Sequence, residues 1–185
     1  MGLKKILPIV FLTLLGTILV LTATTALPVS YYPPALNNIN NPPALGSIRI
    51  DIPVKPTEAK VVVNIGNDVM SGDLPLGIKY MTRMVKRFKE KNINWKLSGV
   101  FHNTAGYMLL KDGIYNAKRQ VLTGNPYKTL IESLIRDGVS IEICALTMEA
   151  NSYKNEDLIP GVKVVEAAEL RIIQLVDEHY VQIIP

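Results

Sequence analysis

The sequence predicts an α/β fold, in which a five-stranded parallel sheet is doubly wound with helices on both faces. Short runs of branched apolar residues recur through the last two thirds of the chain. Between these runs, apolar residues recur at steps of three and four, which is the spacing of amphipathic helices. Strands that alternate with helices form right-handed βαβ crossovers, and these make the strands parallel and place helices against the sheet.

Five strands and five helices are predicted between residue 58 and the end of the chain. The strands span residues 61–65, 95–101, 139–144, 162–165 and 180–184, and the helices span residues 74–88, 104–110, 125–137, 145–150 and 167–176. Asn125 and Pro126 are typical of a helix start, and Gly138 is typical of a helix end because glycine readily adopts the left-handed conformation. The sequence contains no internal repeat, so residues 58–185 are predicted to form one domain.

Residues 1–26 are predicted to be a signal peptide or a membrane anchor. Lys4 and Lys5 form a basic start, residues 6–21 are apolar, and small residues follow at 23–26. This is the pattern of a secretory signal peptide. The apolar or weakly polar stretch 6–29 is also long enough to cross a bilayer, so an uncleaved anchor is the alternative. Both place the rest of the protein outside the cytoplasm, as a secreted, periplasmic or cell-surface protein.

Residues 27–57 are predicted to be a linker, because they are rich in proline and asparagine. Proline at this density favours extended chain over packed structure. Within the linker, Ile48, Ile50 and Ile52 alternate with polar residues, which is the period of a half-buried strand. Residues 48–54 are therefore predicted to be an edge strand or disordered chain, and both alternatives stay open.

Composition excludes several classes of protein. Hydrophobic residues make up 48% and charged residues 19% of the 185 residues, which is typical of a globular domain. The formal net charge is +4 and falls to +2 without residues 1–26, so charge gives no reason to expect a nucleic-acid partner. The two histidines, His102 and His179, have no neighbours at metal-ligand spacing, and no metal site is predicted. Residues 64–68 hold one glycine where a dinucleotide loop has three, so no organic cofactor is predicted.

Polar and reactive side chains follow three of the predicted strands. Asn64 lies at the end of the first strand, His102 and Asn103 follow the second, and Cys144 ends the third. The carboxyl ends of parallel strands meet at one edge of a sheet, and ligands of such folds bind beyond that edge. We therefore expect these four side chains to line one site.

Cys144 is the only cysteine, so the chain cannot form an internal disulfide. It lies where a predicted strand passes into a helix, and the free amides of a helix N-terminus favour negative charge. Because the thiolate is the nucleophilic form of cysteine, this position suits sulfur chemistry. The alternative is a small buried residue that ends a core strand, since unpaired cysteine is among the most buried residue types.

Residues 60–185 resemble the DsrE/DsrF-like family of small sulfur-relay proteins. The resemblance lies in a co-linear set of segments: 61–68, 100–103, 109–110, 125–126, 130–131, 138–139, 143–144 with 147–148, 158–162, 169–174 and 180–185. It implies a flavodoxin-like fold that assembles as trimers or hexamers. In the best-understood relatives a cysteine carries sulfur as a persulfide and passes it to a partner thiol, and Cys144 is the matching position. We expect Thr147, in the same matched segment, to line the pocket around it.

Three functions are compatible with these observations. The first is an exported persulfide carrier, in which Cys144 accepts a sulfane sulfur and hands it to the thiol of a partner protein or of another subunit. The second is a non-catalytic oligomeric module that binds a small ligand or a protein near the membrane, with Cys144 packed in the core. The third is a redox switch that forms an intermolecular disulfide. The sequence leaves open whether the protein is an enzyme.

Overall fold

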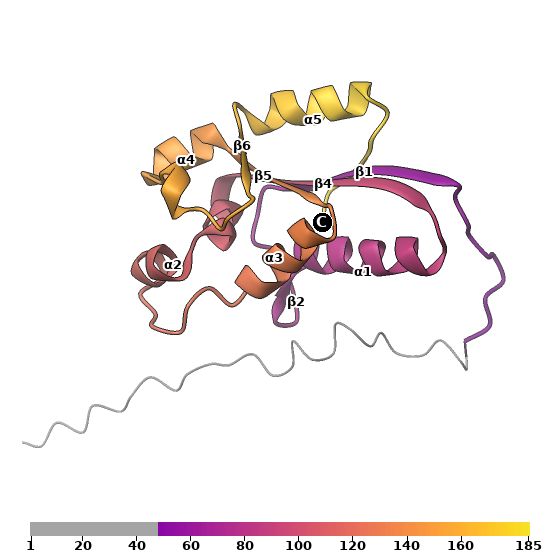
Figure 1. Ribbon diagram of the computed structural model, residues 1–185, viewed down its shortest axis with the longest axis horizontal. Helices are drawn as coiled ribbons and strands as arrows, with labels where there is room; N and C mark the ends of the chain where they lie inside the picture. Colours follow the sequence, from indigo (N-terminus) through magenta and orange to yellow (C-terminus); the bar gives the residue numbers. More distant parts are fainter. Residues whose placement is uncertain (1–47) are drawn as a thin grey trace, which may run out of the picture. The chain divides into compact units, whose positions relative to one another are not determined.

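A five-stranded sheet forms the middle layer of the domain in the computed structural model, which describes residues 48–185 (Figure 1). All its strands are parallel, in the order β6-β5-β4-β1-β7. They are β1 (Glu58–Ile65), β4 (Asn94–Phe101), β5 (Ser140–Cys144), β6 (Lys163–Val165) and β7 (Val181–Ile183). The five predicted strands and their parallel arrangement are confirmed. Two further strands of two residues each, β2 (Met70–Ser71) and β3 (Leu74–Pro75), form a separate antiparallel hairpin.

The order of the strands differs from that of flavodoxin, although the layered α/β architecture is the one expected. Numbered along the chain, the sheet runs 4-3-2-1-5, whereas flavodoxin runs 2-1-3-4-5. Here β1, β4, β5 and β6 are added one after another in the same direction across the sheet. In a right-handed crossover, the direction in which the next strand is added decides which face of the sheet the connection covers. The connections between these four strands therefore lie on one face. The last crossover, from β6 back to β7, runs in the opposite direction and covers the other face.

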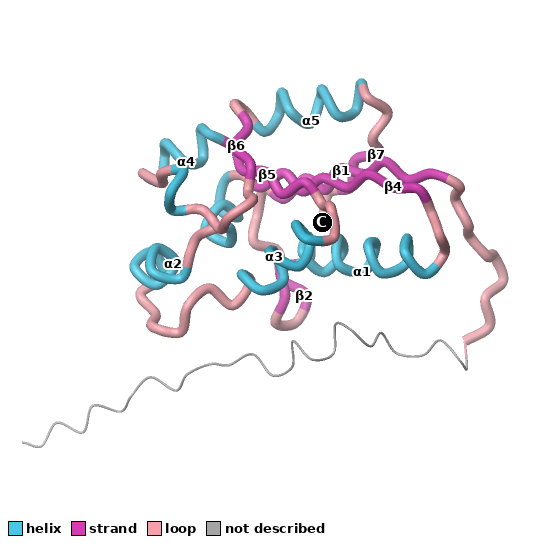
Figure 2. Tube along the Cα trace, viewed as in Figure 1, coloured by secondary structure: helices cyan, strands magenta, loops and turns pink. Residues whose placement is uncertain are grey.

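The helices follow this division between the two faces of the sheet. They are α1 (Leu76–Glu90), α2 (Asp112–Arg119), α3 (Lys128–Arg136), α4 (Ala145–Asn151) and α5 (Ala168–Asp177), with the 3₁₀ helices η2 (Asn103–Leu109) and η3 (Asn155–Asp157). Figure 2 shows α1 and α3 below the sheet and α5 above it. The predicted short helix at 104–110 is a 3₁₀ helix, and α2 lies between two predicted helices, in a segment where none is predicted.

The larger core lies between the sheet and α1. Alternate residues of β1, Val61, Val63 and Ile65, point into it, and the apolar stripe of α1 packs against them. The two layers approach closely because β4 carries a glycine: a Cβ atom at Gly99 would lie 2.6 Å from the sulfur of Met81. Apolar residues of η2, α3 and the segment after α4 complete this core on the same face.

A smaller core lies on the opposite face, under α5. It is formed by Val62, Val100, Cys144, Ala168, Ile172 and Leu175. Cys144, the candidate residue at the end of β5, therefore lies on the face that α5 covers.

Residues 48–57 form neither strand nor helix. The side chains of Ile48, Ile50 and Ile52 are exposed, so the edge strand considered for residues 48–54 is absent. An alternating pattern stabilises a strand only where a neighbouring strand can pair with it, and β6 and β7 form the sheet edges instead. The predicted leader and most of the predicted linker lie outside the described residues. Within residues 48–185 no helix is both long enough and apolar enough to cross a membrane.

Candidate functional site

The carboxyl ends of β1 and β4 bring Asn64 and His102 into direct contact. The Oδ1 atom of Asn64 and the Nε2 atom of His102 are 2.7 Å apart. The backbone amide of His102 also donates a hydrogen bond to the carbonyl oxygen of Ile65, at 3.0 Å. Two residues that are far apart in the sequence therefore form one polar pair at the edge of the sheet.

A glycine in the loop after β1 makes room for the imidazole ring. A Cβ atom at Gly66 would lie 2.8 Å from Cε1 and 2.9 Å from Nε2 of His102, closer than van der Waals contact allows. The ring therefore rests on bare backbone on one side, while Asn64 holds its Nε2 atom. Both contacts restrict the rotation of the ring.

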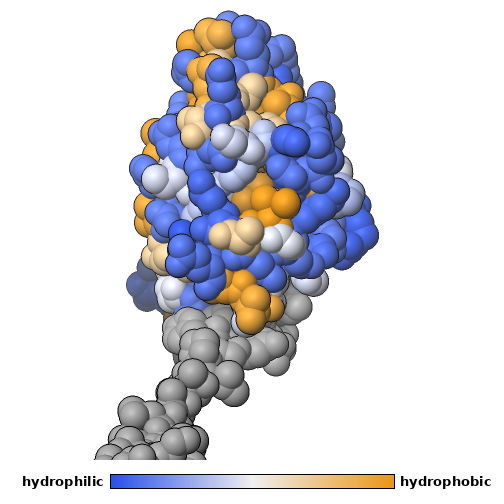
Figure 3. Space-filling model, turned by 90° about the vertical axis from the view of Figure 1, so that its left-hand side faces the viewer, coloured by the Kyte–Doolittle hydropathy of each residue, from blue (hydrophilic) through white to orange (hydrophobic). Residues whose placement is uncertain are grey.

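Two adjoining pockets lie at this edge and share His102 and Asn103. The larger has a volume of about 340 Å³, and it is lined by His102, Asn103, Thr104, Cys144, Leu146, Thr147, Ala150, Asn151, Ala168 and Glu169. The smaller, of about 150 Å³, is lined by Asn64, Ile65, Gly66, Asn67, His102, Asn103, Ile184 and Pro185. Four of the five predicted site residues thus line the larger pocket, and Asn64 lines only the smaller one. Figure 3 looks at the end of the domain that bears α2 and α4, where most of the surface is hydrophilic.

Cys144 lies at the inner wall of the larger pocket. The residue is only 3% exposed and belongs to the core under α5. It is also the N-cap residue of α4, in extended conformation, and its side chain makes no capping hydrogen bond. Strand β5 and helix α4 thus place Cys144 between the apolar core under α5 and the larger pocket.

The opposite wall of the pocket is fixed by contacts between η2 and α4. The backbone amide of Asn103, a residue with φ of +47°, donates a hydrogen bond to Oγ1 of Thr147 at 2.9 Å. The methyl group of Thr147 leaves no room for a side chain at Gly106, where a Cβ atom would lie 2.7 Å from it. The role of Thr147 in the structure is therefore to brace η2 against α4.

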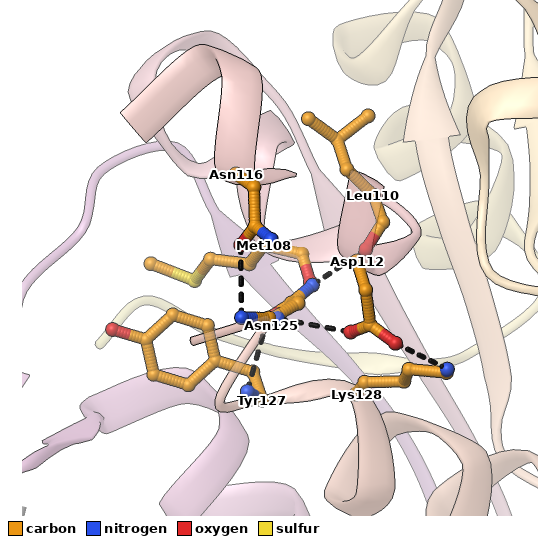
Figure 4. Close-up of polar contacts among 8 residues, drawn as sticks. Met108, Leu110, Asp112, Asn116, Asn125, Tyr127 and Lys128 are labelled. Carbon is orange, nitrogen blue, oxygen red and sulfur yellow. Dashed lines mark hydrogen bonds and ion pairs between the residues drawn. The ribbon is translucent and has the colours of Figure 1, made fainter. Parts of the chain in front are cut away.

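A buried amide network supports η2 from behind, and the close-up in Figure 4 shows it. The Asn125 side chain is 6% exposed in total, and its Nδ2 atom donates to the carbonyl oxygens of Met108 and Leu110 at 2.8 and 2.7 Å. Its Oδ1 atom accepts from the amide of Tyr127 at 3.0 Å, an Asx turn that precedes α3. Asn125, the predicted first residue of this helix, therefore lies two residues before the N-cap residue of α3, which is Tyr127.

Asp112 anchors the same network at its other end. It accepts a hydrogen bond from the amide of Asn125 at 3.0 Å and pairs with Lys128 at 2.7 Å. The hydrogen bond from Lys128, followed by that from Asn125, lowers the pKa of the Asp112 carboxyl. The sequence analysis did not find this network, because its members are recognisable only once α2 and α3 are placed.

A tyrosine cluster is a second feature that the sequence analysis missed. The rings of Tyr107, Tyr115 and Tyr127 have centroids 5.9 to 6.4 Å apart, and the guanidinium of Arg119 lies 4.4 Å from the centre of the Tyr107 ring. Burial, and then the neighbouring Tyr107, raises the pKa of Tyr127 to about 12. These phenols therefore stay neutral at physiological pH and contribute packing and hydrogen bonds.

A third missed feature is an ion pair on the α5 face. Glu142, 1% exposed, receives two hydrogen bonds from Arg171, at 2.8 and 3.1 Å, and one from the hydroxyl of Ser140 at 2.9 Å. The hydrogen bonds to Glu142 raise the pKa of Arg171. The pair borders a hollow of about 370 Å³ beside β5 and β6, which extends past the carboxyl end of β6. The alternation of Glu142 with Ile141 and Ile143 indicates that its side chain lies on the opposite face of the strand from theirs. It does not indicate that Arg171 covers it there.

Among residues 48–185 no group of three or more histidine, cysteine, aspartate or glutamate side chains is placed to hold a metal ion. The arrangement is that of an α/β protein with a two-part pocket of mixed polar and apolar lining at the carboxyl edge of its sheet and one cysteine in the pocket wall. The DsrE/DsrF-like family model matches residues 68–183, and the chain belongs to that family. The resemblance read from the sequence is thereby confirmed.

Two solved structures are similar to this one. The protein of unknown function MTH1491 from Methanobacterium thermoautotrophicum is 20% identical, with a TM-score of 0.55, over 69% of this chain and 99% of that chain. The ychN protein from E. coli is 14% identical, with a TM-score of 0.49, over 68% of this chain and 97% of that chain. No curated protein sequence matches this chain. The first structure supports the fold, and its chain consists of this one domain.

Proposed function

We propose that this protein is a sulfur carrier of the sulfur-relay type, in which Cys144 bears the transferred sulfur. The observation that carries the proposal is the position of Cys144 in the wall of a pocket of about 340 Å³, beside His102 and Asn103, in a member of the DsrE/DsrF-like family. A sulfur in a buried wall reacts only with what enters the pocket, which suits a carrier that must shield a labile persulfide from water.

The proposed transfer moves one sulfur atom without any external oxidant or reductant. The Cys144 thiolate attacks the outer sulfur of a donor persulfide, R–S–SH, and a new sulfur–sulfur bond forms. The sulfur–sulfur bond of the donor breaks, and the donor leaves as a thiolate with the electron pair. The proton lost by the Cys144 thiol balances the proton that the leaving thiolate takes up. Delivery repeats the step in reverse, with an acceptor thiolate attacking the outer sulfur on Cys144.

His102 is the group that we assign to proton movement in this pocket. Its Nε2 atom is held by Asn64 at 2.7 Å, and its ring lies between the two pockets. Imidazole is the side chain whose ordinary pKa lies nearest to neutral pH. Because the chain has one cysteine, the acceptor thiol must belong to another protein or another subunit.

We propose that the carrier acts outside the cytoplasm as a homo-oligomer. The basic and apolar start of the sequence supports export or anchoring, and the family resemblance supports trimers or hexamers. Exposed apolar side chains on α5, Leu170 and Ile173, with more than half of their surface in solvent, support contact between subunits on that face.

Intact-mass measurement after exposure to inorganic polysulfide tests the sulfur carrier. We expect the native protein to gain the mass of one or more sulfur atoms, and the gain to vanish on treatment with a reducing thiol. Cys144→Ser should gain none. His102→Gln keeps the thiol and the pocket, and it should gain sulfur several-fold more slowly, in line with the loss of a general acid–base group.

The burial of Cys144 favours the second candidate, a binding module with the cysteine in its core. The same experiment separates the two functions when the unfolded protein is included as a control. If urea-unfolded protein gains sulfur and native protein does not, the thiol is sealed and the carrier proposal is rejected. A bulky maleimide reagent should modify native protein more slowly than polysulfide does, because the pocket limits access.

A further inference from the structure

Helix α1 carries a stripe of four positive charges along its length. Lys79, Arg83, Arg87 and Lys91 are spaced by four residues, and Lys91 is the C-cap residue. Each of the four is turned by about 40° from the one before, so they form a slanted row of about 18 Å in which the neighbours Arg83 and Arg87 share one face. The two central members of this basic stripe, Arg83 and Arg87, are exposed.

The contacts around α1 leave the centre of the basic stripe facing solvent. Lys79 donates to Oγ of Ser71 at 2.7 Å, and Lys91 donates to the carbonyl oxygen of Val54 at 2.6 Å. Both acceptors are neutral, so these hydrogen bonds hold the ends of the row without cancelling its charge.

Two carboxylates near α1 pair with lysines that lie beside the row rather than on it. Glu90 pairs with Lys86 at 3.9 Å, and Asp137 pairs with Lys89 at 2.6 Å. Like charges four residues apart destabilise a helix. The stripe therefore lowers the stability of the isolated domain. Contact with an anionic surface would turn this repulsion into a net attraction.

Charge is divided between the two faces of the sheet. On the opposite face, α5 and the residue after it carry Glu169, Asp177 and Glu178, and the only cation of α5, Arg171, pairs with Glu142. Since α1 and α5 lie on opposite sides of the sheet (Figure 2), the positive face of the domain is that of α1.

The chain outside the described residues joins the domain at the same place. The described part begins at residue 48, and Val54 is held by Lys91 at the end of the basic stripe. The preceding residues 27–47 carry no charge, and residues 6–29 have the apolar character of a segment that enters or crosses a bilayer. If residues 6–29 stay in the bilayer as the uncleaved anchor, the chain that leads from the membrane joins the described domain beside the stripe.

We propose that the basic stripe of α1 docks on the anionic headgroups of a lipid bilayer. An uncleaved anchor would hold the domain near the membrane surface, and anionic headgroups in the leaflet on the domain's side would attract basic residues beside it. Docked in this way, α1 faces the bilayer and α5 faces away from it. This inference is independent of the sulfur chemistry at Cys144.

Vesicle co-sedimentation tests the proposal with a protein of residues 48–185, which lacks the apolar segment. The fold stands as an entire chain in MTH1491, so this part is expected to fold by itself. We expect binding to vesicles of phosphatidylcholine with phosphatidylglycerol, no binding to phosphatidylcholine alone, and loss of binding at high salt. Equal binding to the two kinds of vesicle, or binding to neither, would overturn the proposal.

Two charge-matched variants locate the binding surface. R83Q with R87Q should weaken partition into the anionic vesicles by about 30-fold, since each basic residue near the surface contributes about fivefold. K154Q with K163Q removes the same charge from the segment between α4 and the end of β6, and it should weaken partition by less than about twofold. Thermal unfolding checks that both variants fold.

An equal loss in both variants would mean that only net charge matters, and it would overturn the stripe as the site. Two other occupants are distinguished by the same protein. Tighter salt-sensitive binding to duplex DNA than to the vesicles would assign the stripe to nucleic acid instead. Self-association at low salt without vesicle binding would assign it to a second copy of the chain.

Discussion

At Glu142 the fold keeps a carboxylate almost entirely out of water. An isolated charge in such a place loses several kcal/mol of hydration, and only a well-formed ion pair recovers this loss. Here the guanidinium of Arg171 provides two hydrogen bonds, and the hydroxyl of Ser140 provides a third. Arg171 has 24% of its side chain exposed, so the pair is buried on one side and hydrated on the other.

Removing Arg171 should therefore destabilise the domain more than removing both charges. For Arg171→Gln we expect a loss of about 3 kcal/mol in the free energy of unfolding, because Glu142 stays buried without its cation. The double variant with leucine at positions 142 and 171 should come within about 1 kcal/mol of the wild type. Urea unfolding with comparable m-values measures both. Equal losses in the single and double variants would contradict this account.

At the scale of elements, the short helix η2 depends on a buried side chain from another segment. Asn125 donates to the last carbonyls of η2 and the residue after it, and η2 in turn carries Asn103 into the pocket. The position of one pocket wall is thus set by an amide side chain 22 residues further along the chain. A 3₁₀ helix has poor hydrogen-bond geometry by itself, so this external support decides whether it persists.

Asn125→Ala should loosen η2 selectively. Two buried carbonyl oxygens would lose their partners, and we expect a loss of about 2–4 kcal/mol in the free energy of unfolding. Amide hydrogen exchange over residues 103–109 should accelerate more than exchange in α1. Asn116→Ala removes one hydrogen bond of the same network, to Gly124, and serves as a milder control. Unchanged exchange over 103–109 in Asn125→Ala would contradict the supporting role.

The elements were predictable from the sequence where their own residues determine them. Val61–Val62–Val63 is apolar on both sides because helices cover both faces of the sheet, and the stripe of α1 is buried at the predicted positions. Helix α2 was not predictable, since it has only eight residues and Tyr115 is the only one of them that is buried. Strands β2 and β3, of two residues each, are too short to have a period.

The sequence predicted at which edge of the sheet the candidate site lies, but not the contacts and burial of its side chains. The strand-end rule brought Asn64, His102 and Asn103 to one edge, and the structure puts the first two in contact. The sequence left open whether Cys144 is buried or accessible, because this depends on where α5 crosses the sheet. That crossing follows from the strand order, which periodicity does not encode.

At the scale of the whole molecule, the face that carries α5 exposes several large apolar side chains to solvent. Leu170, Ile173 and Val176 on α5 are 55%, 57% and 45% exposed, and Val164 on the edge strand β6 is 38% exposed. Contiguous exposed apolar side chains are typical of surfaces that bind another protein. With α1 turned to a bilayer, this face remains available to other subunits.

We expect the protein of residues 48–185 to sediment as a trimer or hexamer in analytical ultracentrifugation. Leu170→Lys with Ile173→Lys should shift it towards the monomer, because two charges would have to be buried at the contact. Leu122→Lys is the matched control: Leu122 is 95% exposed in a loop, so its replacement should leave the mass unchanged. A wild-type protein that is monomeric at micromolar concentration would reject the assembly.

Strand β7 has a consequence for the order in which the protein can be completed. It pairs with the first strand of the sheet, and the two residues that follow it, Ile184 and Pro185, line the smaller pocket. Residues 181–183 are the last of the sheet strands to be synthesised, so β1 stays unpaired on that side until the rest of the described domain has been made. For a protein that crosses a membrane before it folds, such a delay would keep the chain open during its passage.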